Sequence, residues 1–223
     1  MDIIDYTIFG ISIVAFFSIL YGRKRGVRLD SKPVTKREAI DLGLPSGLLW
    51  ATCNVGASNP QDYGLYFAWG ETTGYTAEQV TGGERAFDDA TYQAGAAASI
   101  SADLTLEQDA AHTYLGGNWR MPTEDEWQEL IDNCNSTWTI DYNGTGVNGW
   151  TFTSKINGGS VFFPAAGYCY DSLVVNVGLY GRYWSATCYD KEYVSLFGFF
   201  PWNIDTNDSE PWLGFSVRAV CER

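Results

Sequence analysis

The chain contains a single histidine, His112, in the stretch DAAHTYLGG. A serine or cysteine nucleophile activated by histidine would have to be built on this residue, because such a nucleophile needs a nearby base that a third group orients. No neighbour in the sequence supplies that third group. We therefore interpret His112 as a surface or helix-end histidine, and we expect no catalytic residues and no enzyme activity.

The five cysteines show neither a CxxC pair nor a zinc-like spacing. So few cysteines do not make a disulfide scaffold, and an odd number leaves at least one thiol unpaired in a monomer. Cys53 and Cys221 could form a disulfide if the first and last strands of the domain are neighbours. Free, partly buried thiols explain the same residues equally well. We expect no bound metal ion and no cofactor.

The charge of the chain is divided unevenly. Residues 1–37 hold seven Lys/Arg and three Asp/Glu, whereas residues 38–223 carry a net charge of −17. So acidic a body repels the phosphates of nucleic acids, and it contains no stripe of basic and aromatic residues. We expect no nucleic-acid partner.

An uncharged, mostly apolar run covers residues 6–22, and the basic stretch RKRGVR follows it directly. As a helix, this run would be about 25 Å long. It favours a single transmembrane anchor over 1–26, with a polar linker over 27–38, rather than a buried core helix or a cleaved signal peptide. The basic flank places the domain in the cytoplasm by the positive-inside rule, whereas a ligand-binding role favours the cell surface. The side of the membrane stays open.

Short strand-like runs and one clear helix would position any site in the body. The turn LPSG leads into a strand over 48–55, and a second aromatic strand ends at Gly70. Thr123 and Glu126 have the spacing of a capping box and predict a helix that begins at Glu124. Acidic residues in the first turn of a helix interact favourably with its dipole, which accounts for the paired carboxylates Glu124 and Asp125. Residues 75–113 are less regular and are interpreted as an insertion or surface loop with one short helix.

The C-terminal half alternates strand-like runs with Gly/Asn turns. TFTSKINGGSVFF has the pattern of a β-hairpin, and RYWSAT and GFSVRAV resemble strands. Between the last two runs, no period of two or of 3.6 continues across 189–212, which predicts an irregular surface. The class is α+β, with more loop than usual.

Several stretches together resemble a known family. DLGLPSGLLWATCNVGA, YFAWGET, WRMPTEDEW, GSVFFPAAGY, YWSAT and GFSVRAV occur in this order in bacterial domains of the Fibrobacter succinogenes major paralogous type. NWRMPTEDEWQEL is also similar to a helix entry in C-type-lectin-fold proteins of the formylglycine-generating-enzyme branch. The resemblance covers about residues 41–221. Many such domains are variable proteins of diversity-generating retroelements, found in gut Bacteroides-like bacteria and their phages.

The resemblance implies a C-type lectin-like fold over residues 39–223, with two helices, small antiparallel sheets and a loop-rich ligand-binding face, preceded by the transmembrane helix. In retroelement targets, Asn codons of a template are copied with errors at adenines, so the positions between fixed framework residues vary. The variable region would cover 168–213 and bind a protein or glycan partner. Tyr and Trp suit such a surface because they give large contact areas at little entropic cost.

The positions expected to contact a partner lie between the framework stretches: Cys169, Tyr170, Leu173, Val175, Tyr180, Arg182, Tyr189, Asp190, Lys191, Tyr193, Ser195, Phe200, Trp202, Asn203, Asp205, Asn207, Asp208, Glu210 and Trp212. Phe197 and Phe199 alternate and are assigned to the core instead. Trp202, Lys191 and Trp212 of this set, and Glu192 beside them, cannot arise from an Asn codon by changes at adenine alone, so they are the weaker candidates.

Three alternatives remain beside the diversified binder. A fixed-specificity adhesin or structural envelope module of the same fold would share every framework stretch. An enzyme of the formylglycine-generating type would need signatures that the chain lacks. Calcium-dependent sugar binding is the third, because EPW (Glu210–Trp212) and WNID (Trp202–Asp205) are similar to animal-lectin motifs. Their order is reversed, and no carboxylate cage of about six to eight oxygens surrounds them, so we interpret this likeness as coincidence.

Overall fold

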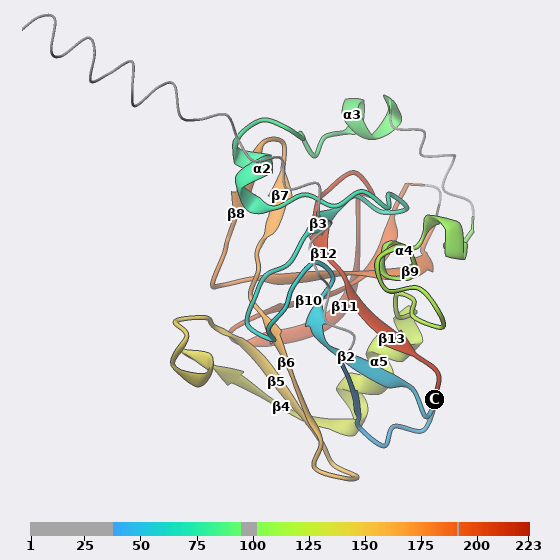
Figure 1. Cartoon of the computed structure of the whole chain (residues 1–223), viewed down its shortest axis with the longest axis vertical. Helices are drawn as coiled ribbons and strands as arrows, with labels where there is room; N and C mark the ends of the chain where they lie inside the picture. The colour runs from blue at the N-terminus through green and yellow to red at the C-terminus, as the bar shows by residue number, and fades with distance from the viewer. Residues whose placement is uncertain (1–37, 95–101, 191) are drawn as a thin grey trace, which may run out of the picture. The chain divides into compact units, whose positions relative to one another are not determined.

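The computed structural model describes residues 38–94, 102–190 and 192–223, which form an α+β domain of small, mostly antiparallel sheets and a few short helices (Figure 1). The predicted anchor over 6–22 and nearly all of the linker lie outside the described residues. Within the described part of the chain, no helix combines the length and apolar character needed to cross a membrane.

The largest sheet has five strands in the order β11-β10-β9-β12-β3. Its strands are β3 (Tyr66–Phe67), β9 (Gly181–Cys188), β10 (Val194–Phe200), β11 (Asn203–Ser209) and β12 (Phe215–Ser216). The predicted strand before Gly70 is therefore reduced to two residues. The prediction of an irregular surface over 189–212 is wrong, because a regular β10–β11 hairpin fills most of it, joined by a two-residue turn at Pro201 and Trp202.

The other strands form three smaller sheets. They are β1 (Ala39–Asp41), β2 (Leu49–Asn54) and β13 (Arg218–Cys221) in the order β1-β2-β13, then β4 (Cys134–Thr139), β5 (Gly149–Ser154) and β6 (Ser160–Pro164), and the hairpin of β7 (Tyr168–Tyr170) and β8 (Leu173–Val175). The hairpin predicted around NGG is confirmed as β5–β6. The predicted run GFSVRAV is divided at Val217, so that β12 and β13 join different sheets.

The strand predicted over 48–55 and the last strand of the domain are neighbours, as the disulfide alternative required. β13 pairs with β2 in antiparallel fashion, and Cys221 lies opposite Leu49 rather than Cys53. All five cysteines are free thiols in the structure. The pairing of β2 with β13 therefore joins the two ends of the domain through backbone hydrogen bonds.

The helices are α2 (Ala77–Thr81), α3 (Asp89–Ala94), α4 (Ala110–Leu115) and α5 (Glu124–Asn133), with short 3-10 turns η1 (Leu106–Gln108) and η2 (Tyr142–Gly144). Two α-helices, α2 and α3, and the start of a third, α4, lie within residues 75–113, where one short helix was expected. Val80, Phe87 and Tyr92 from this stretch are buried, so it contributes to the core as well as to the surface. Helix α4 holds His112.

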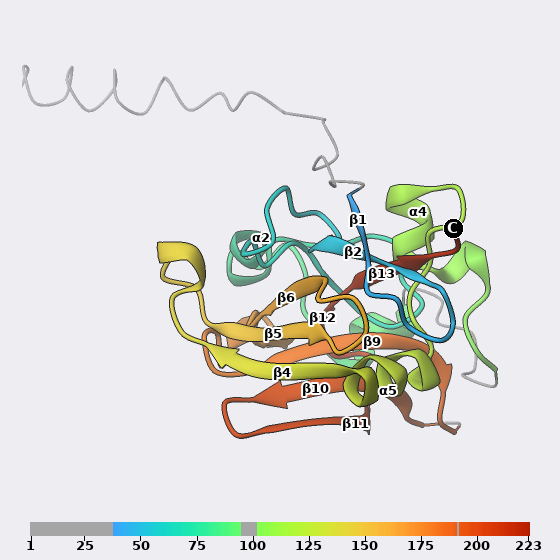
Figure 2. The same ribbon diagram turned by 90° about the horizontal axis from the view of Figure 1, so that it is seen from below.

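Helix α5 begins at Glu124 with the predicted capping box. The hydroxyl of Thr123 accepts from the Glu126 N–H, and the Glu126 carboxylate accepts from the Thr123 N–H. Behind the cap, α5 contacts β9, β10 and β11 on one side and β4 and β5 on the other (Figure 2). Trp127 and Leu130, on the predicted apolar face, are fully buried. The helix therefore supports one face of the large sheet.

Glu126 also holds an ion pair that links α5 to the segment before it. The guanidinium of Arg120 donates to both carboxylate oxygens, at 2.7 and 2.6 Å. Burial alone would raise the pKa of Glu126, but the hydrogen bonds from Arg120 and Thr123 outweigh it and hold this pKa below the ordinary 4.5. The ionised carboxylate therefore stabilises the fold at neutral pH.

Glu126→Gln is expected to lower the free energy of unfolding by about 1–2 kcal/mol at pH 7, because a charge-assisted bidentate contact is lost. The stabilisation is fully present above pH 4.5 and is lost as the pH falls through the lowered folded-state pKa. Urea unfolding of both proteins from pH 7 to pH 3 should show the difference shrinking below pH 4.5. Asp125→Asn, an exposed acid in the same helical turn, is the control. An equal loss at every pH would contradict this assignment.

Candidate functional site

The large sheet has one buried face and one partly open face. In β10, Phe197 and Phe199 point to the side of α5 and belong to its apolar cluster, whereas Val194 and Leu196 point to the opposite side. Both predicted core phenylalanines are confirmed as buried. Since side chains alternate along a strand, Gly198 and Phe200 follow Leu196 on the face away from α5.

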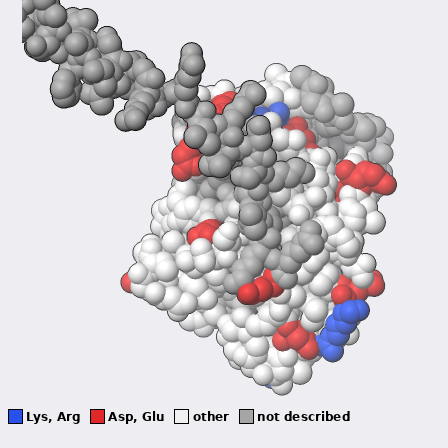
Figure 3. Space-filling view, viewed as in Figure 1, with Lys and Arg blue, Asp and Glu red and all other residues white. Residues whose placement is uncertain are grey.

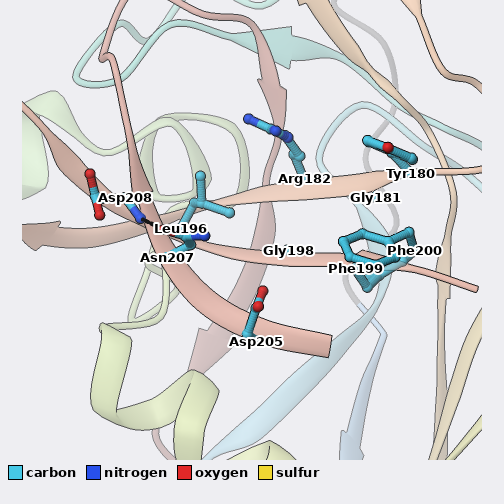
Figure 4. Close-up of a pocket in the computed structure, with 10 residues that line it drawn as sticks. All are labelled: Tyr180, Gly181, Arg182, Leu196, Gly198, Phe199, Phe200, Asp205, Asn207 and Asp208. Atoms are coloured by element: carbon cyan, nitrogen blue, oxygen red, sulfur yellow. Dashed lines mark hydrogen bonds between the residues drawn. The ribbon is translucent and has the colours of Figure 1, made fainter. Parts of the chain in front are cut away.

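Strand register places residues from three strands together on this open face. Gly198 of β10 lies opposite Arg182 of β9 and opposite Asp205 of β11. Neighbouring strands are about 4.8 Å apart, so Arg182 and Asp205 flank Gly198 with Cα atoms roughly 10 Å from each other. Figure 4 shows the Arg182 and Asp205 side chains on either side of Gly198.

A hollow with a volume of about 250 Å³ lies on this face, and we call it the Gly198 hollow. Its lining is Tyr180, Gly181, Arg182, Leu196, Gly198, Phe199, Phe200, Asp205, Asn207 and Asp208 (Figure 4). Six of these ten residues were predicted from the sequence to contact a partner: Tyr180, Arg182, Phe200, Asp205, Asn207 and Asp208. They come from positions as far apart as 180 and 208, and the sheet brings them together.

Gly198 forms the floor of the hollow because it has no side chain. A Cβ atom at this position would lie 3.0 Å from Cδ1 of Leu196 and 3.8 Å from Oδ1 of Asp205. Any larger side chain would therefore occupy the space between the two charged residues. The other carboxylate oxygen of Asp205, Oδ2, accepts from the Asn203 amide at 2.8 Å, which fixes the carboxylate with Oδ1 towards the hollow.

Arg182 is held by aromatic rings. Its guanidinium carbon lies 4.6 Å from the ring centroid of Tyr168 and 5.4 Å from that of Phe215. Cation–π contacts of this kind stabilise a guanidinium by about 0.5–1 kcal/mol at an exposed site. Among the described residues, no carboxylate forms an ion pair with Arg182. Its hydrogen-bond donors are therefore oriented without being neutralised.

Aromatic side chains form a wall at one end of the hollow. The ring of Phe200 lies 5.6 Å from that of Tyr180 and 5.1 Å from that of Trp202. Trp202 is 76% exposed at the tip of the β10–β11 hairpin. Trp and Tyr are among the residues enriched at binding hot spots.

The remaining predicted positions are divided among three places. Cys169 and Ser195 are buried, so they offer no surface to a partner. Tyr170, Leu173 and Val175 lie on the β7–β8 hairpin, where Tyr170 and Leu173 are exposed. The others belong to β11 or to connections around β9–β11: Tyr189, Asp190, Tyr193, Asn203, Glu210 and Trp212. Lys191 lies outside the described residues.

Trp212 is only partly exposed. It packs against two buried apolar clusters and lies 5.9 Å from the Tyr170 ring, measured between ring centroids. It therefore joins the β7–β8 hairpin to the core. On the face shown in Figure 3, acidic side chains are scattered and basic ones are few, in agreement with the charge of the sequence.

His112 lies in α4, and among the described residues no hydroxyl or thiol is hydrogen-bonded to its ring. Its Nδ1 atom is 3.2 Å from the carbonyl oxygen of Trp119. The adjacent Asp109 carboxylate accepts instead from the backbone N–H groups of His112 and Met121, at 3.0 and 2.7 Å. Asp109 thus caps the helix and fastens the following loop, and burial raises its pKa.

Burial determines the reactivity of two cysteines in the described part of the chain. Burial raises the pKa of Cys134 to about 11 and also raises the pKa of Cys169, which keeps both as inert thiols at neutral pH. In the described ranges, no group of three or more His, Cys, Asp and Glu side chains is close enough to hold a metal ion.

The sequence did not reveal several residues that determine the shape of the hollow. Gly198 forms the floor, Leu196 and Phe199 line it, and Tyr168 supports Arg182. One signal was available, because a single glycine inside a strand often marks a place where another group approaches the backbone closely. Gly198 stands alone between Phe197 and Phe199 in such a run.

No protein-family model, no curated protein and no solved structure matches this chain.

Proposed function

We propose that the chain is a membrane-anchored ligand-binding protein, in which the face around the Gly198 hollow binds a protein or glycan partner. The domain would have the C-type lectin-like fold and belong to the variable proteins of diversity-generating retroelements. The anchor would be residues 6–22, and the binding would involve no chemical step. The observation that carries the proposal is that six residues expected to vary line one hollow on the large sheet.

The separation of buried core residues from residues that line the hollow, in and beside β9 and β10, supports this proposal. Trp184 and Phe197, from the same strands as the hollow, are fully buried in the core, while Tyr180 and Arg182 line the hollow. A surface that varies without unfolding the protein needs such a separation. All six predicted lining residues can also arise from an Asn codon by changes at its adenines. The pairing of β2 with β13, which joins the ends of the domain, supports the proposed fold.

Trp202 favours a second candidate, a fixed-specificity adhesin or envelope module of the same fold. It is the most exposed large apolar side chain among the described residues, and its codon cannot arise from an Asn codon by adenine changes. A binder with one evolved partner would place a fixed Trp at such a point, since Trp is enriched at binding hot spots.

Sequencing this gene in sister isolates separates the two candidates. Programmed variation predicts replacements at Tyr180, Arg182, Asp205 and Asn207, with Trp184 and Phe197 unchanged in every isolate. A fixed binder predicts that the first four residues vary no more than the rest of the surface. Replacements spread evenly over residues 38–223 would contradict the proposal of diversification.

A further inference from the structure

Strand β11 forms one edge of the large sheet. In the described part of the chain its only strand neighbour is β10, and Figure 2 shows it along the lower border of the domain. It has seven residues, and all seven pair with β10 without a bulge. A regular edge strand of this length is a template for pairing with another chain.

The β10–β11 turn determines which backbone groups of β11 face outward. Because the turn has two residues, the residues that flank it form a hydrogen-bonded pair, and such pairs alternate along an antiparallel ladder. Ile204, Thr206 and Asp208 therefore direct their N–H and C=O groups away from β10. The Asp208 N–H donates to Oδ1 of Asn207 at 2.9 Å. The outward groups of Ile204 and Thr206 have no hydrogen-bond partner among the described residues.

Charge is the one usual protection that this edge has. Natural edge strands are often short or bulged, or carry proline or lysine, whereas β11 is long and regular and contains neither residue. Asp205 and Asp208 are exposed, and within the described ranges neither forms an ion pair. Asn203 donates to one oxygen of the Asp205 carboxylate at 2.8 Å. The edge therefore carries two negative charges that no described side chain neutralises.

These two charges discriminate between possible partners. A second copy of the chain would bring its own Asp205 and Asp208 to the junction, and residues 38–223 of each copy carry a net charge of −17. Repulsion therefore disfavours pairing between two copies. A strand with Lys or Arg opposite the aspartates gains instead, because opposite charges directly across two strands stabilise the pair and like charges destabilise it.

We infer that β11 binds an extended, basic segment of a protein partner, which adds to the large sheet as a further strand. The backbone of the segment exchanges hydrogen bonds with Ile204 and Thr206, and its basic side chains lie opposite Asp205 and Asp208. In this mode of recognition the main chain gives affinity and the side chains give specificity. The inference rests on the proposed binding role and names the partner and the mode of binding.

This mode is compatible with a surface that varies. Asp205 and Asp208 belong to the positions expected to vary, so the preference for a basic segment is a property of this particular sequence. The outward N–H and C=O groups of β11 do not depend on which side chains it carries. They would supply a constant part of the affinity in every variant.

Three fluorescein-labelled peptides test the inference on the full-length chain in a nonionic detergent, with binding measured by fluorescence anisotropy. The peptide KTVKVT, laid antiparallel along β11, places its lysines opposite Asp208 and Asp205. Its valines then lie opposite Thr206 and Ile204. ETVEVT carries glutamates at the lysine positions, and KTPKVT lacks the N–H group opposite Thr206. KTVKVT should bind at least about tenfold more tightly than either. Equal binding of the three peptides, or no binding of KTVKVT, would overturn the inference.

Thr206→Pro tests the backbone contact. It removes an outward N–H without touching the hydrogen bonds to β10, and proline is tolerated at such positions of an edge strand. KTVKVT should bind this variant at least about tenfold more weakly, while thermal unfolding stays close to that of the wild type. Thr206→Val keeps the N–H and is the matched control, which should bind as the wild type does. Unchanged binding to a folded Thr206→Pro protein would contradict strand addition.

A second pair of variants decides the question even if Thr206→Pro does not fold. Replacing both Asp205 and Asp208 by Asn should abolish the preference for KTVKVT over ETVEVT and keep the preference over KTPKVT. Glu222→Gln, an exposed acid in the segment after β13, should change neither preference. A double variant that still prefers KTVKVT over ETVEVT as strongly as the wild type would overturn the assignment of these two charges.

Sedimentation of the unliganded chain tests the alternative of a second copy. We expect no association that depends on β11, whereas a dimer that Thr206→Pro abolishes would show self-pairing and overturn the inference. The genetic test of programmed variation is separate. If KTVKVT binds but the isolates show no focused variation, β11 is a fixed docking edge. If variation is focused but KTVKVT does not bind, the binding face remains and strand addition is rejected.

Discussion

Arg218→Met is expected to destabilise the domain by about 3 kcal/mol or more. The guanidinium is completely buried and donates to the Asn54 side chain at 3.0 and 2.8 Å. It also donates to the carbonyl oxygens of Ala51 and Phe162, at 2.9 and 3.0 Å. Methionine would leave these acceptors buried without a donor, at a cost of about 1–3 kcal/mol each. Urea unfolding at pH 7 measures the loss.

Arg223→Met is the matched control for Arg218. Arg223 forms an ion pair with Asp41 at the surface, where its side chain is more than half exposed. Exposed ion pairs contribute about 0–1 kcal/mol, so this variant should unfold almost as the wild type does. Equal losses for the two arginine variants would show that the buried network does not hold β13 to β2 and β6.

The second large effect is expected for Phe197→Ala, with a loss of about 3–5 kcal/mol. The ring is fully buried and stacks on Trp127, with centroids 4.4 Å apart and planes at 7°. Removing it opens a cavity between β10 and α5, where the surrounding rings cannot collapse inward without losing other contacts. Thermal and urea unfolding should both detect this change.

Trp202→Ala gives the comparison within the same hairpin. The side chain is exposed and contacts Phe200 by a ring edge, so its removal should change stability by no more than about 0.5 kcal/mol. Together the two results would show that the fold depends on Phe197 in β10, whereas Trp202 at the tip of the same hairpin can be replaced without loss of stability. A loss at Trp202 as large as that at Phe197 would contradict the division between framework and binding surface.

Local signals predicted the local parts of the fold well. The capping box of Thr123 and Glu126 defined the start of α5, because both of its hydrogen bonds join residues three apart. The turn at Gly47 and the β5–β6 hairpin likewise depend on neighbouring residues. For the same reason, the α+β class followed from the alternation of turn residues and short apolar runs.

The β10–β11 hairpin could not be predicted from periodicity. Most residues of β10 are buried, including those beside the hollow, so Val194–Phe200 shows no alternation of apolar and polar residues. Strand β11 lies at the edge of the sheet and is mostly polar. The pattern of two appears where one face meets water and the other meets the core. Strand β10 is buried almost throughout, and the partly buried face of β11 carries only one apolar residue, Ile204, so neither sequence shows the pattern.

Six of the ten residues that line the hollow had been named from the sequence, but the shape of the hollow had not been predicted. Tyr180, Arg182 and Asp205 were identified because they lie between framework stretches. The role of Gly198 depends on the register of three strands, which connects residues far apart in the sequence. The burial of Ser195 and of Arg218 follows from the same long-range pairing, and no local pattern reports it.

The most direct test of diversification is to sequence the DNA that flanks this gene. We predict a near-copy of the segment encoding residues 167–218 beside a reverse-transcriptase gene, differing from it almost only where the copy has adenine. The differences should include the codons of Tyr180, Arg182, Asp205 and Asn207 and leave those of Trp184 and Phe197 unchanged. The absence of such a copy, or differences concentrated in the codons of buried residues, would contradict the proposal that this surface is diversified.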